Sequence, residues 1–201
     1  MQIAIITSEF GSNAGGLSFG CLSYAQMLSS LGYEITIISS SYENWNTNAY
    51  NSKFPIIGNK LVICDGGYKK ELKENLFFRA HIRNVLSEIS ETKYDFFISF
   101  GAGLNGLFAS ELSYILKVKL FVLLRGSEIN LSVSDSNLHT FNYRCLKQAQ
   151  KVIALSEELL ERSKQIYYNP NAEYHVIPNS IDSCNYISTF TPAKKTFVLG
   201  C

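Results

Sequence analysis

Two nearby stretches, Lys151-Val-Ile-Ala-Leu-Ser-Glu-Glu-Leu159 and Val176-Ile-Pro-Asn-Ser-Ile-Asp182, decide the fold that this sequence predicts. The first begins with Lys151–Leu155, a short apolar run that is typical of a strand buried on both faces. Ser156 follows this run as a helix N-cap, and carboxylates occupy the next two positions, where a helix favours negative charge. The stretch therefore predicts a buried strand that leads directly into a helix.

The same helix has a clear end, and a second strand follows it. We expect the helix to run to about Tyr168, because the Asn169-Pro170 pair cannot continue it. Tyr174–Ile177 is then a second short strand, which ends at Pro178. The β-α-β unit of Met1–Ser40 likewise has a strand, a helix and a strand, and it predicts a right-handed crossover between parallel strands.

We expect more strands and helices to alternate through the rest of the chain. Each expected strand is a short apolar run, and each expected helix repeats apolar residues at a spacing of three and four. The expected strands are Ile3–Thr7, Glu34–Ser39, Leu61–Cys64, Asp95–Phe100 and Lys119–Leu124, and the expected helices are Leu17–Leu31, Tyr68–Glu91, Leu107–Leu116 and Leu138–Ala149. Residues 40–59 are expected to form a polar excursion over the surface. The alternation predicts an α/β fold, a doubly wound Rossmann-like parallel sheet with helices on both faces.

Composition excludes several classes of protein. The chain has 201 residues and a net charge of +1, so it has no strong field that would attract nucleic acid. Its five cysteines are an odd number without a C-x-x-C pair, and its three histidines are isolated, which predicts reduced thiols and no metal site. No basic segment precedes the first strand, and no apolar run approaches the roughly 18 residues of a membrane span. We therefore expect a cytoplasmic protein.

Taken together, the order of these pieces resembles a known family. Ala149-Gln-Lys-Val-Ile153, Leu155-Ser-Glu-Glu-Leu159 and Val176-Ile-Pro-Asn-Ser-Ile-Asp182 are similar to three successive motifs of the retaining glycosyltransferases of the GT4 type, which have the two-domain GT-B fold. Ser180 stands where that family usually has glycine. The resemblance implies that residues 1–190 are the N-terminal, acceptor-side domain. It also implies that residues 191–201 are a linker and the first strand of a missing C-terminal domain that binds the nucleotide-sugar.

A glycine pair opens the first expected helix. Gly15 and Gly16 let a backbone come close to a ligand, and the start of a helix offers free N–H groups to an anion. The resembled family has a glycine pair here and a later motif to which Leu28-Ser-Ser-Leu-Gly-Tyr-Glu-Ile-Thr-Ile37 is similar. The resemblance implies that the pair faces the donor phosphates or the acceptor. The alternative is a turn that only connects a strand to a helix.

A second motif, Arg125-Gly126-Ser127-Glu128, ends an expected strand. Ligands of open parallel sheets bind beyond the carboxyl ends of the strands, where this motif is expected to lie. An arginine can donate two parallel hydrogen bonds to a phosphate or carboxylate, and Glu128 can accept hydrogen bonds from sugar hydroxyls. Many members of the resembled family have Asp where this chain has Glu128. A surface pair of Arg125 and Glu128 beside a turn is the alternative.

Four further residues are secondary candidates for the site: Ser156, Glu157, Asn179 and Asp182. Ser156 either contacts substrate or only caps its own helix. Asn179 and Asp182 are expected to shape a hinge turn, since Asn and Asp side chains bond their own backbone.

A competing motif is Gly101-Ala-Gly-Leu-Asn-Gly106, a G-x-G-x-x-G sequence between an expected strand and an expected helix. With Glu128 about 20 residues further on, it matches the fingerprint of dinucleotide binding. However, the fingerprint normally follows the first strand, and here it follows a middle one. A tight turn is the simpler explanation.

The function that the resemblance implies is transfer of a sugar from a nucleotide-sugar, linked to UDP or GDP, to a hydroxyl of a saccharide or lipid-linked acceptor, with retention. It implies no metal and no cofactor beyond this co-substrate, and it places the catalytic residues in the missing domain, which docks on the site face. The fragment alone is then expected to be inactive. The basic stretch Tyr68–Arg83 of an expected helix could contact the inner face of a membrane peripherally. The pattern favours the alternative, a solvated basic face on a helix whose apolar stripe packs on the sheet. Two alternatives stay open, an NAD(P)-binding oxidoreductase domain and a non-catalytic module that binds a sugar or a partner.

Overall fold

The computed structural model describes residues 1–8, 15–39, 56–58 and 70–179. In this part the strands are β1 (Gln2–Thr7), β2 (Glu34–Ser39), β3 (Ile56–Gly58), β4 (Phe96–Phe100), β5 (Lys119–Leu124), β6 (Lys151–Ala154) and β7 (Glu173–Val176). The helices are α1 (Gly15–Ser30), α2 (Lys70–Ile89), α3 (Gly103–Leu116), α4 (Ser127–Leu131), α5 (Ser136–Gln148) and α6 (Glu157–Tyr167).

The strands form one parallel sheet in the order β3-β2-β1-β4-β5-β6-β7. The chain starts in the middle of the sheet, winds to β3 through β2, and then returns across β1 to add β4 to β7 on the other side. This reversal between β1 and β4 is the switch point of a doubly wound sheet, where ligands bind beyond the carboxyl ends of the strands. The predicted fold class is confirmed.

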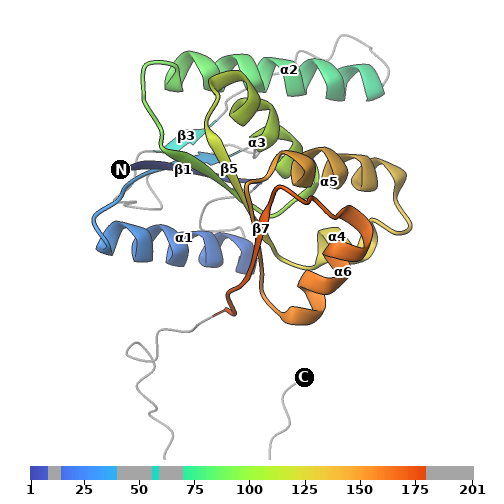
Figure 1. Cartoon of the computed structure of the whole chain (residues 1–201). Coiled ribbons are helices and arrows are strands. Elements are labelled where there is room, and N and C mark those ends of the chain that lie inside the picture. The colour runs from blue at the N-terminus through green and yellow to red at the C-terminus, as the bar shows by residue number, and fades with distance from the viewer. Residues whose placement is uncertain (9–14, 40–55, 59–69, 180–201) are drawn as a thin grey trace, which may run out of the picture.

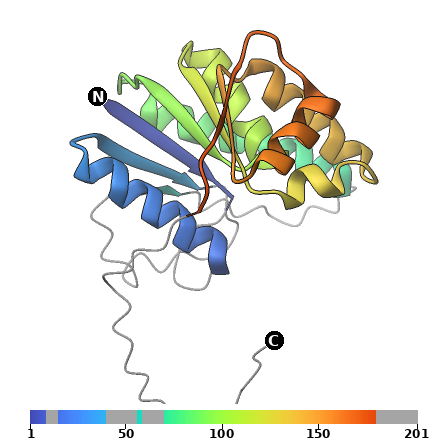
Figure 2. The same cartoon turned by 60° about the horizontal axis from the view of Figure 1, so that its bottom comes forward.

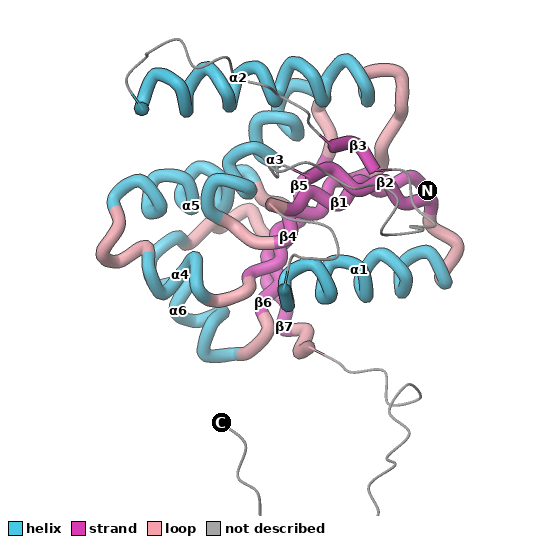
Figure 3. Tube along the Cα trace, turned by 180° about the vertical axis from the view of Figure 1, so that it is seen from behind, coloured by secondary structure: helices cyan, strands magenta, loops and turns pink. Residues whose placement is uncertain are grey.

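Helices cover the two faces of the sheet unequally (Figures 1 and 3). Within the described part, α1 lies on one face, where Cys21 and Ala25 pack on Ile3, Ile5 and neighbouring apolar residues. The other face carries α2, α3 and α5, and its core also includes residues of α4 and α6. The strands at the centre are apolar on both sides because both faces are covered there, which is why their sequences show no alternation.

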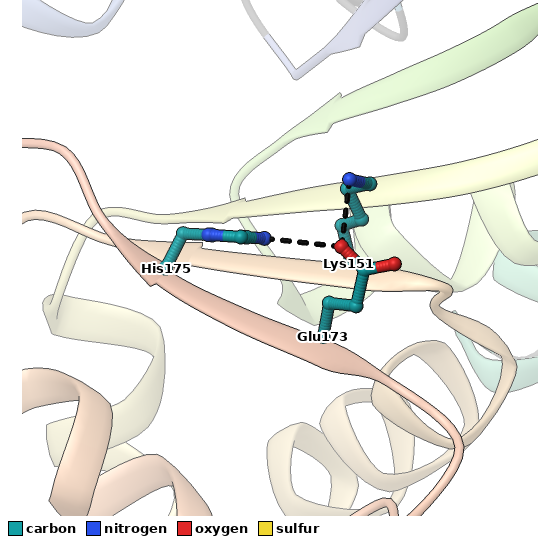
Figure 4. Close-up of polar contacts among 3 residues, drawn as sticks. All are labelled: Lys151, Glu173 and His175. Carbon is teal, nitrogen blue, oxygen red and sulfur yellow. Dashed lines mark hydrogen bonds and ion pairs between the residues drawn. The ribbon is translucent and has the colours of Figure 1, made fainter.

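The edge strand β7 carries charged side chains, one of which pairs with a lysine on the neighbouring strand β6. Glu173 Oε2 accepts a hydrogen bond from Lys151 Nζ at 2.7 Å and lies 3.3 Å from His175 Nε2 (Figure 4). The hydrogen bond from Lys151, followed by that from His175, lowers the pKa of Glu173. Because these groups are exposed, they add little stability. Charges of this kind discourage other chains from pairing with an edge strand.

Three local predictions were wrong. Residues 56–58 are a strand, not part of a surface excursion, because they pair in parallel with Ile37, Ile38 and Ser39 of β2. Helix α3 begins at Gly103 and not at Leu107. The short helix α4 was not expected at all. The predicted strand Leu61–Cys64, the domain boundary at residue 190 and the predicted strand after it lie outside the described residues.

Candidate functional site

The predicted site residues come from the carboxyl edge of the sheet. Arg125 follows β5, Ser156 follows β6, and Asn179 lies just beyond the end of β7. The chain that leaves β7 passes beside the first turns of α1 (Figure 2). The fold therefore brings residues that are more than 100 positions apart in the sequence to one edge.

Arg125 is the centre of this edge. Its guanidinium carbon lies 4.7 Å from the centre of the Phe100 ring, at the end of the neighbouring strand β4. Its Nη1 atom donates a hydrogen bond to Asn179 Oδ1 at 3.2 Å. A partly buried guanidinium stacked on an aromatic face is held in one orientation, and its remaining N–H groups stay available to an anion.

Helix α1 approaches this arginine closely at Gly20. A Cβ at position 20 would lie 3.1 Å from Phe100 Cζ and 3.2 Å from Arg125 Nη2. One turn later, the Tyr24 ring meets Phe100 edge-on at 5.6 Å between centroids. No local signal in the sequence predicts these contacts, since Gly20 looks like any small residue within a helix.

The charge of Arg125 also affects two weak acids on α1. Burial raises the pKa of the Cys21 thiol to about 12, although a hydrogen bond with Thr7 and the positive charge of Arg125 oppose this rise. Burial likewise raises the pKa of Tyr24, and Arg125 again opposes it. Both groups stay neutral at physiological pH, so neither cancels the positive charge at this edge.

Glu128 has a structural partner within its own turn. Its Oε1 atom accepts a hydrogen bond from the backbone N–H of Arg125 at 2.6 Å, and its backbone carbonyl accepts one from Asn142 Nδ2 at 2.8 Å. Between Arg125 and Ser127, Gly126 takes a φ of +115°, which an L side chain rarely adopts. The motif is thus a tight turn into α4, and contact of Glu128 with a sugar hydroxyl stays a prediction.

The glycine pair lies at the start of α1, as predicted. Gly15 is the first residue of the helix, and Gly16 is exposed. No atom lies within 4 Å of the point where a Cβ at Gly16 would be, so the fold itself does not demand glycine there. That the pair faces a ligand stays a prediction.

The secondary candidates have mixed positions. Ser156 caps α6, because its Oγ accepts from the backbone N–H of Leu159 at 3.2 Å. Glu157 is exposed in the first turn of the same helix. Asn179 contacts Arg125, as described above, and Asp182 lies outside the described residues.

The G-x-G-x-x-G motif has structural reasons for its glycines. Gly101 and Gly103 take φ values of +106° and +69°. A Cβ at Gly106 would lie 2.6 Å from Cys145 Sγ, so this glycine allows α3 to pack tightly on α5. The first N–H of α3, that of Gly103, is already occupied by Asn142 Oδ1 at 2.7 Å. These roles explain the motif as a tight turn and a helix contact.

No group of three or more His, Cys, Asp or Glu side chains within the described ranges is arranged to hold a metal ion. In the same ranges no helix is long and apolar enough to cross a membrane.

The fold defines a Rossmann-like domain whose carboxyl edge carries the positive charge of Arg125 after β5. The chain belongs to Glycosyltransferase Family 4, whose sequence pattern matches residues 14–183. The resemblance inferred from the motifs is therefore confirmed. No curated protein sequence matches this chain.

Several solved structures share the fold at low sequence identity. A sucrose-phosphate synthase structure from Thermosynechococcus elongatus is 12% identical, with a TM-score of 0.63 over 90% of this chain and 91% of that one. HepE from Anabaena in complex with UDP-glucose is 14% identical, with a TM-score of 0.63 over 92% of this chain and 45% of that one. MurG from Acinetobacter baumannii is 13% identical, with a TM-score of 0.54 over 90% and 46%. The chain spans about half the length of the latter two.

Proposed function

We propose that this chain is the acceptor-side domain of a retaining glycosyltransferase that moves a sugar from a nucleotide-sugar to a hydroxyl of a saccharide or lipid-linked acceptor. The observation that carries the proposal is the match of residues 14–183 to Glycosyltransferase Family 4. HepE, which has the same fold, was solved with UDP-glucose, so UDP-sugars are the first donors to test and GDP-sugars the second.

The charge at the carboxyl edge supports this proposal. When a nucleoside diphosphate leaves the sugar, negative charge develops on its oxygens, and donors fixed in advance stabilise that charge. In the proposed site the Arg125 guanidinium and the N–H groups at the start of α1, next to Gly15 and Gly16, supply such donors. Phe100 holds the guanidinium in place, so little reorganisation is needed when the ligand binds.

The proposal includes a second domain. HepE and MurG are about twice the length that this chain covers. We place the base-binding pocket and the catalytic residues in a C-terminal domain that docks against the carboxyl edge, after a boundary near residue 190. Residues 1–201 alone are then inactive, because they hold only one wall of the cleft.

We place the reaction in the cytoplasm, at the inner face of the membrane where the acceptor is lipid-linked. The two described free thiols, Cys21 and Cys145, are both buried, which fits a reducing compartment. The alternative of a dinucleotide-dependent oxidoreductase loses support because Asn142 occupies the N–H of Gly103 that would face a pyrophosphate.

The test uses the full-length polypeptide with UDP-glucose, UDP-N-acetylglucosamine and GDP-mannose, each with a labelled sugar. We expect sugar release or transfer with one of them, and an α-linked product from these α-linked donors, read by proton NMR of the anomeric position. An inverted product would refute retention. Absence of any donor turnover together with tight sugar binding would favour the non-catalytic module. Quenching of the protein's intrinsic fluorescence by NADH, which reports NADH binding, would favour the oxidoreductase.

A further inference from the structure

Asn142 on α5 is a fully buried amide that uses both ends of its side chain. Its Oδ1 atom accepts from the Gly103 N–H at 2.7 Å, and its Nδ2 atom donates to the Glu128 carbonyl at 2.8 Å. The two backbone groups belong to different turns, one after β4 and one after β5. A single side chain therefore ties the two turns at the carboxyl edge to each other.

The turn after β5 needs such a tie. Helix α4 has five residues. Isolated helices of that length are unstable, because the conformational entropy lost in forming the first turn exceeds the gain from the few backbone hydrogen bonds. Its N-cap, Gly126, provides no side-chain hydrogen bond. Asn142 supplies a hydrogen bond to this turn from another helix and fixes the backbone of Glu128.

Fixing the backbone of Glu128 also fixes Arg125. The Glu128 carboxylate accepts from the Arg125 N–H at 2.6 Å, so a displacement of α4 moves the backbone from which the arginine side chain extends. The turn after β4 follows Phe100, on whose ring the guanidinium lies. Asn142 thus connects the backbone behind the arginine to the strand end that carries its stacking partner.

We propose that Asn142 is a positioning residue, which holds the Arg125 guanidinium over Phe100 by joining the turn after β4 to the turn after β5. The inference rests on the proposed function only for its consequence in sugar transfer. The position of Arg125 itself is measurable without any substrate.

The test follows the side-chain Nε–Hε NMR signals of ¹⁵N-labelled arginine in the 201-residue chain, which contains five arginines. The Arg125 signal is assigned by its loss in Arg125→Lys. Its chemical shift depends on the ring current of Phe100, so it reports where the guanidinium lies relative to that ring. Asn142→Asp keeps the size of the side chain, but an ionised carboxylate cannot donate to the Glu128 carbonyl. We expect the Arg125 signal to move in this variant once the pH exceeds the pKa of the introduced carboxyl, while the other four signals stay in place.

Lowering the pH should restore the signal in the same variant. A protonated carboxyl again donates with its O–H and accepts with its other oxygen, and burial raises the pKa of the introduced group above the ordinary aspartate value. Other titratable groups on the elements around Asn142 are Glu111 and Tyr114 on α3, Glu128 on α4, and His139, Tyr143, Cys145 and Lys147 on α5, where Arg144 adds a fixed charge. A parallel titration of the unchanged chain separates their contribution.

Asn169→Asp is the matched control. Asn169, which follows α6, is also a buried amide that bonds to the end of α5. Its Nδ2 atom donates to the carbonyls of Leu146, Lys147 and Ala149, away from the site. We expect it to lower the melting temperature without moving the Arg125 signal. A signal that moves equally in both variants, or in neither, would overturn the proposal.

A second pair of variants keeps the test informative if Asn142→Asp unfolds. Glu128→Ala removes the acceptor for the Arg125 N–H, and Glu128→Gln keeps one. We expect the Arg125 signal to move in the first and to stay in the second, and the reverse result would contradict the proposed chain of contacts. In the full-length enzyme Asn142→Asp should lower kcat by up to about 100-fold at neutral pH, the scale of a 1 Å misplacement. If the signal moves but no donor is turned over by any form, the proposed function fails and the positioning role stands.

Discussion

The guanidinium of Arg125 lies 4.7 Å above the ring of Phe100, so the last residue of β4 supports the first residue after β5. Neighbouring parallel strands end at the same edge, and their final side chains meet there. Gly20 of α1 lies close to both side chains. Two other elements, β4 and α1, therefore lie against the Arg125 side chain, and support of this kind is what a fixed anion site requires.

Arg125→Lys tests whether orientation matters as well as charge. Lysine keeps the positive charge but loses the planar fork and the stacking on Phe100. We expect kcat/KM for the nucleotide-sugar to fall by about 10- to 100-fold, the cost of losing a charge-assisted hydrogen bond. Arg144→Lys is the control, because Arg144 forms an exposed ion pair with Glu111 elsewhere. Equal activity of both variants would exclude Arg125 from the site.

Gly20→Ala separates stability from activity. Alanine in place of glycine within a helix favours the helix by about 1 kcal/mol. At this position, however, the added Cβ would lie 3.2 Å from Arg125 Nη2 and displace the tip of that side chain. We expect only a small change of melting temperature, because the 3.1 Å contact of the added Cβ with the buried Phe100 ring opposes the gain in helix propensity, together with at least a 10-fold loss of kcat/KM. Full activity in a folded Gly20→Ala variant would show that the contact has no functional role.

Gly106→Ala tests whether the glycine motif serves packing. The added Cβ would lie 2.6 Å from Cys145 Sγ, and overpacking of this kind costs about 1–3 kcal/mol. We expect Cys145→Ala to relieve much of that loss when the two changes are combined. Urea unfolding of both single variants and the double variant gives the coupling energy. Additive effects would mean that another neighbour opposes the added methyl group.

Ser156→Ala measures how far this serine is explained by its cap. The hydroxyl accepts from the Leu159 N–H, and loss of such a cap costs about 1 kcal/mol. We expect Ser156→Asp to recover most of this stability, because a carboxylate also caps a helix. If Ser156 contacts substrate, kcat/KM will fall in both variants. If it only caps α6, kcat/KM will stay unchanged in both variants.

The strands and most helices were predictable because their signals are local. Apolar runs located β1, β2, β4, β5 and β6 to within about one residue of their ends. The start of α3 was not predictable, because Asn142, 39 positions away, binds its first N–H. The same holds for α4, which has too few residues for a periodic pattern and is held by contacts from α5.

The position of the candidate site residues in the fold was predictable, but their contacts were not. The rule that ligands bind beyond the carboxyl ends of parallel strands placed Arg125 and Gly15 correctly at one edge. No sequence pattern predicts the contacts of Gly20, Tyr24 and Phe100, because these residues meet only in the folded structure. Motif reading also left Glu128 open as a sugar contact, whereas one of its carboxylate oxygens accepts from the N–H of Arg125.

Acid should destabilise this fold partly through His81 on α2. This side chain is 2% exposed and stacks on Phe108 at 4.2 Å between ring centres. Burial lowers its pKa from 6.5 to about 4, so the unfolded chain binds a proton at a higher pH than the folded chain does. Stability is therefore complete above pH 6.5 and declines as the pH falls toward 4, by about 3 kcal/mol if this group acts alone.

The measurement is the free energy of urea unfolding between pH 7 and pH 4. We expect His81→Phe, which keeps the aromatic contact and removes the titration, to flatten the decline between pH 6.5 and pH 4. The control is His175→Phe, because His175 and its partner Glu173 are both exposed, so loss of their pair should change the slope much less than loss of His81 does. The slope, and not the absolute stability, carries the result, since the larger Phe ring changes packing equally at every pH. An unaltered slope in His81→Phe would assign the acid sensitivity to other groups.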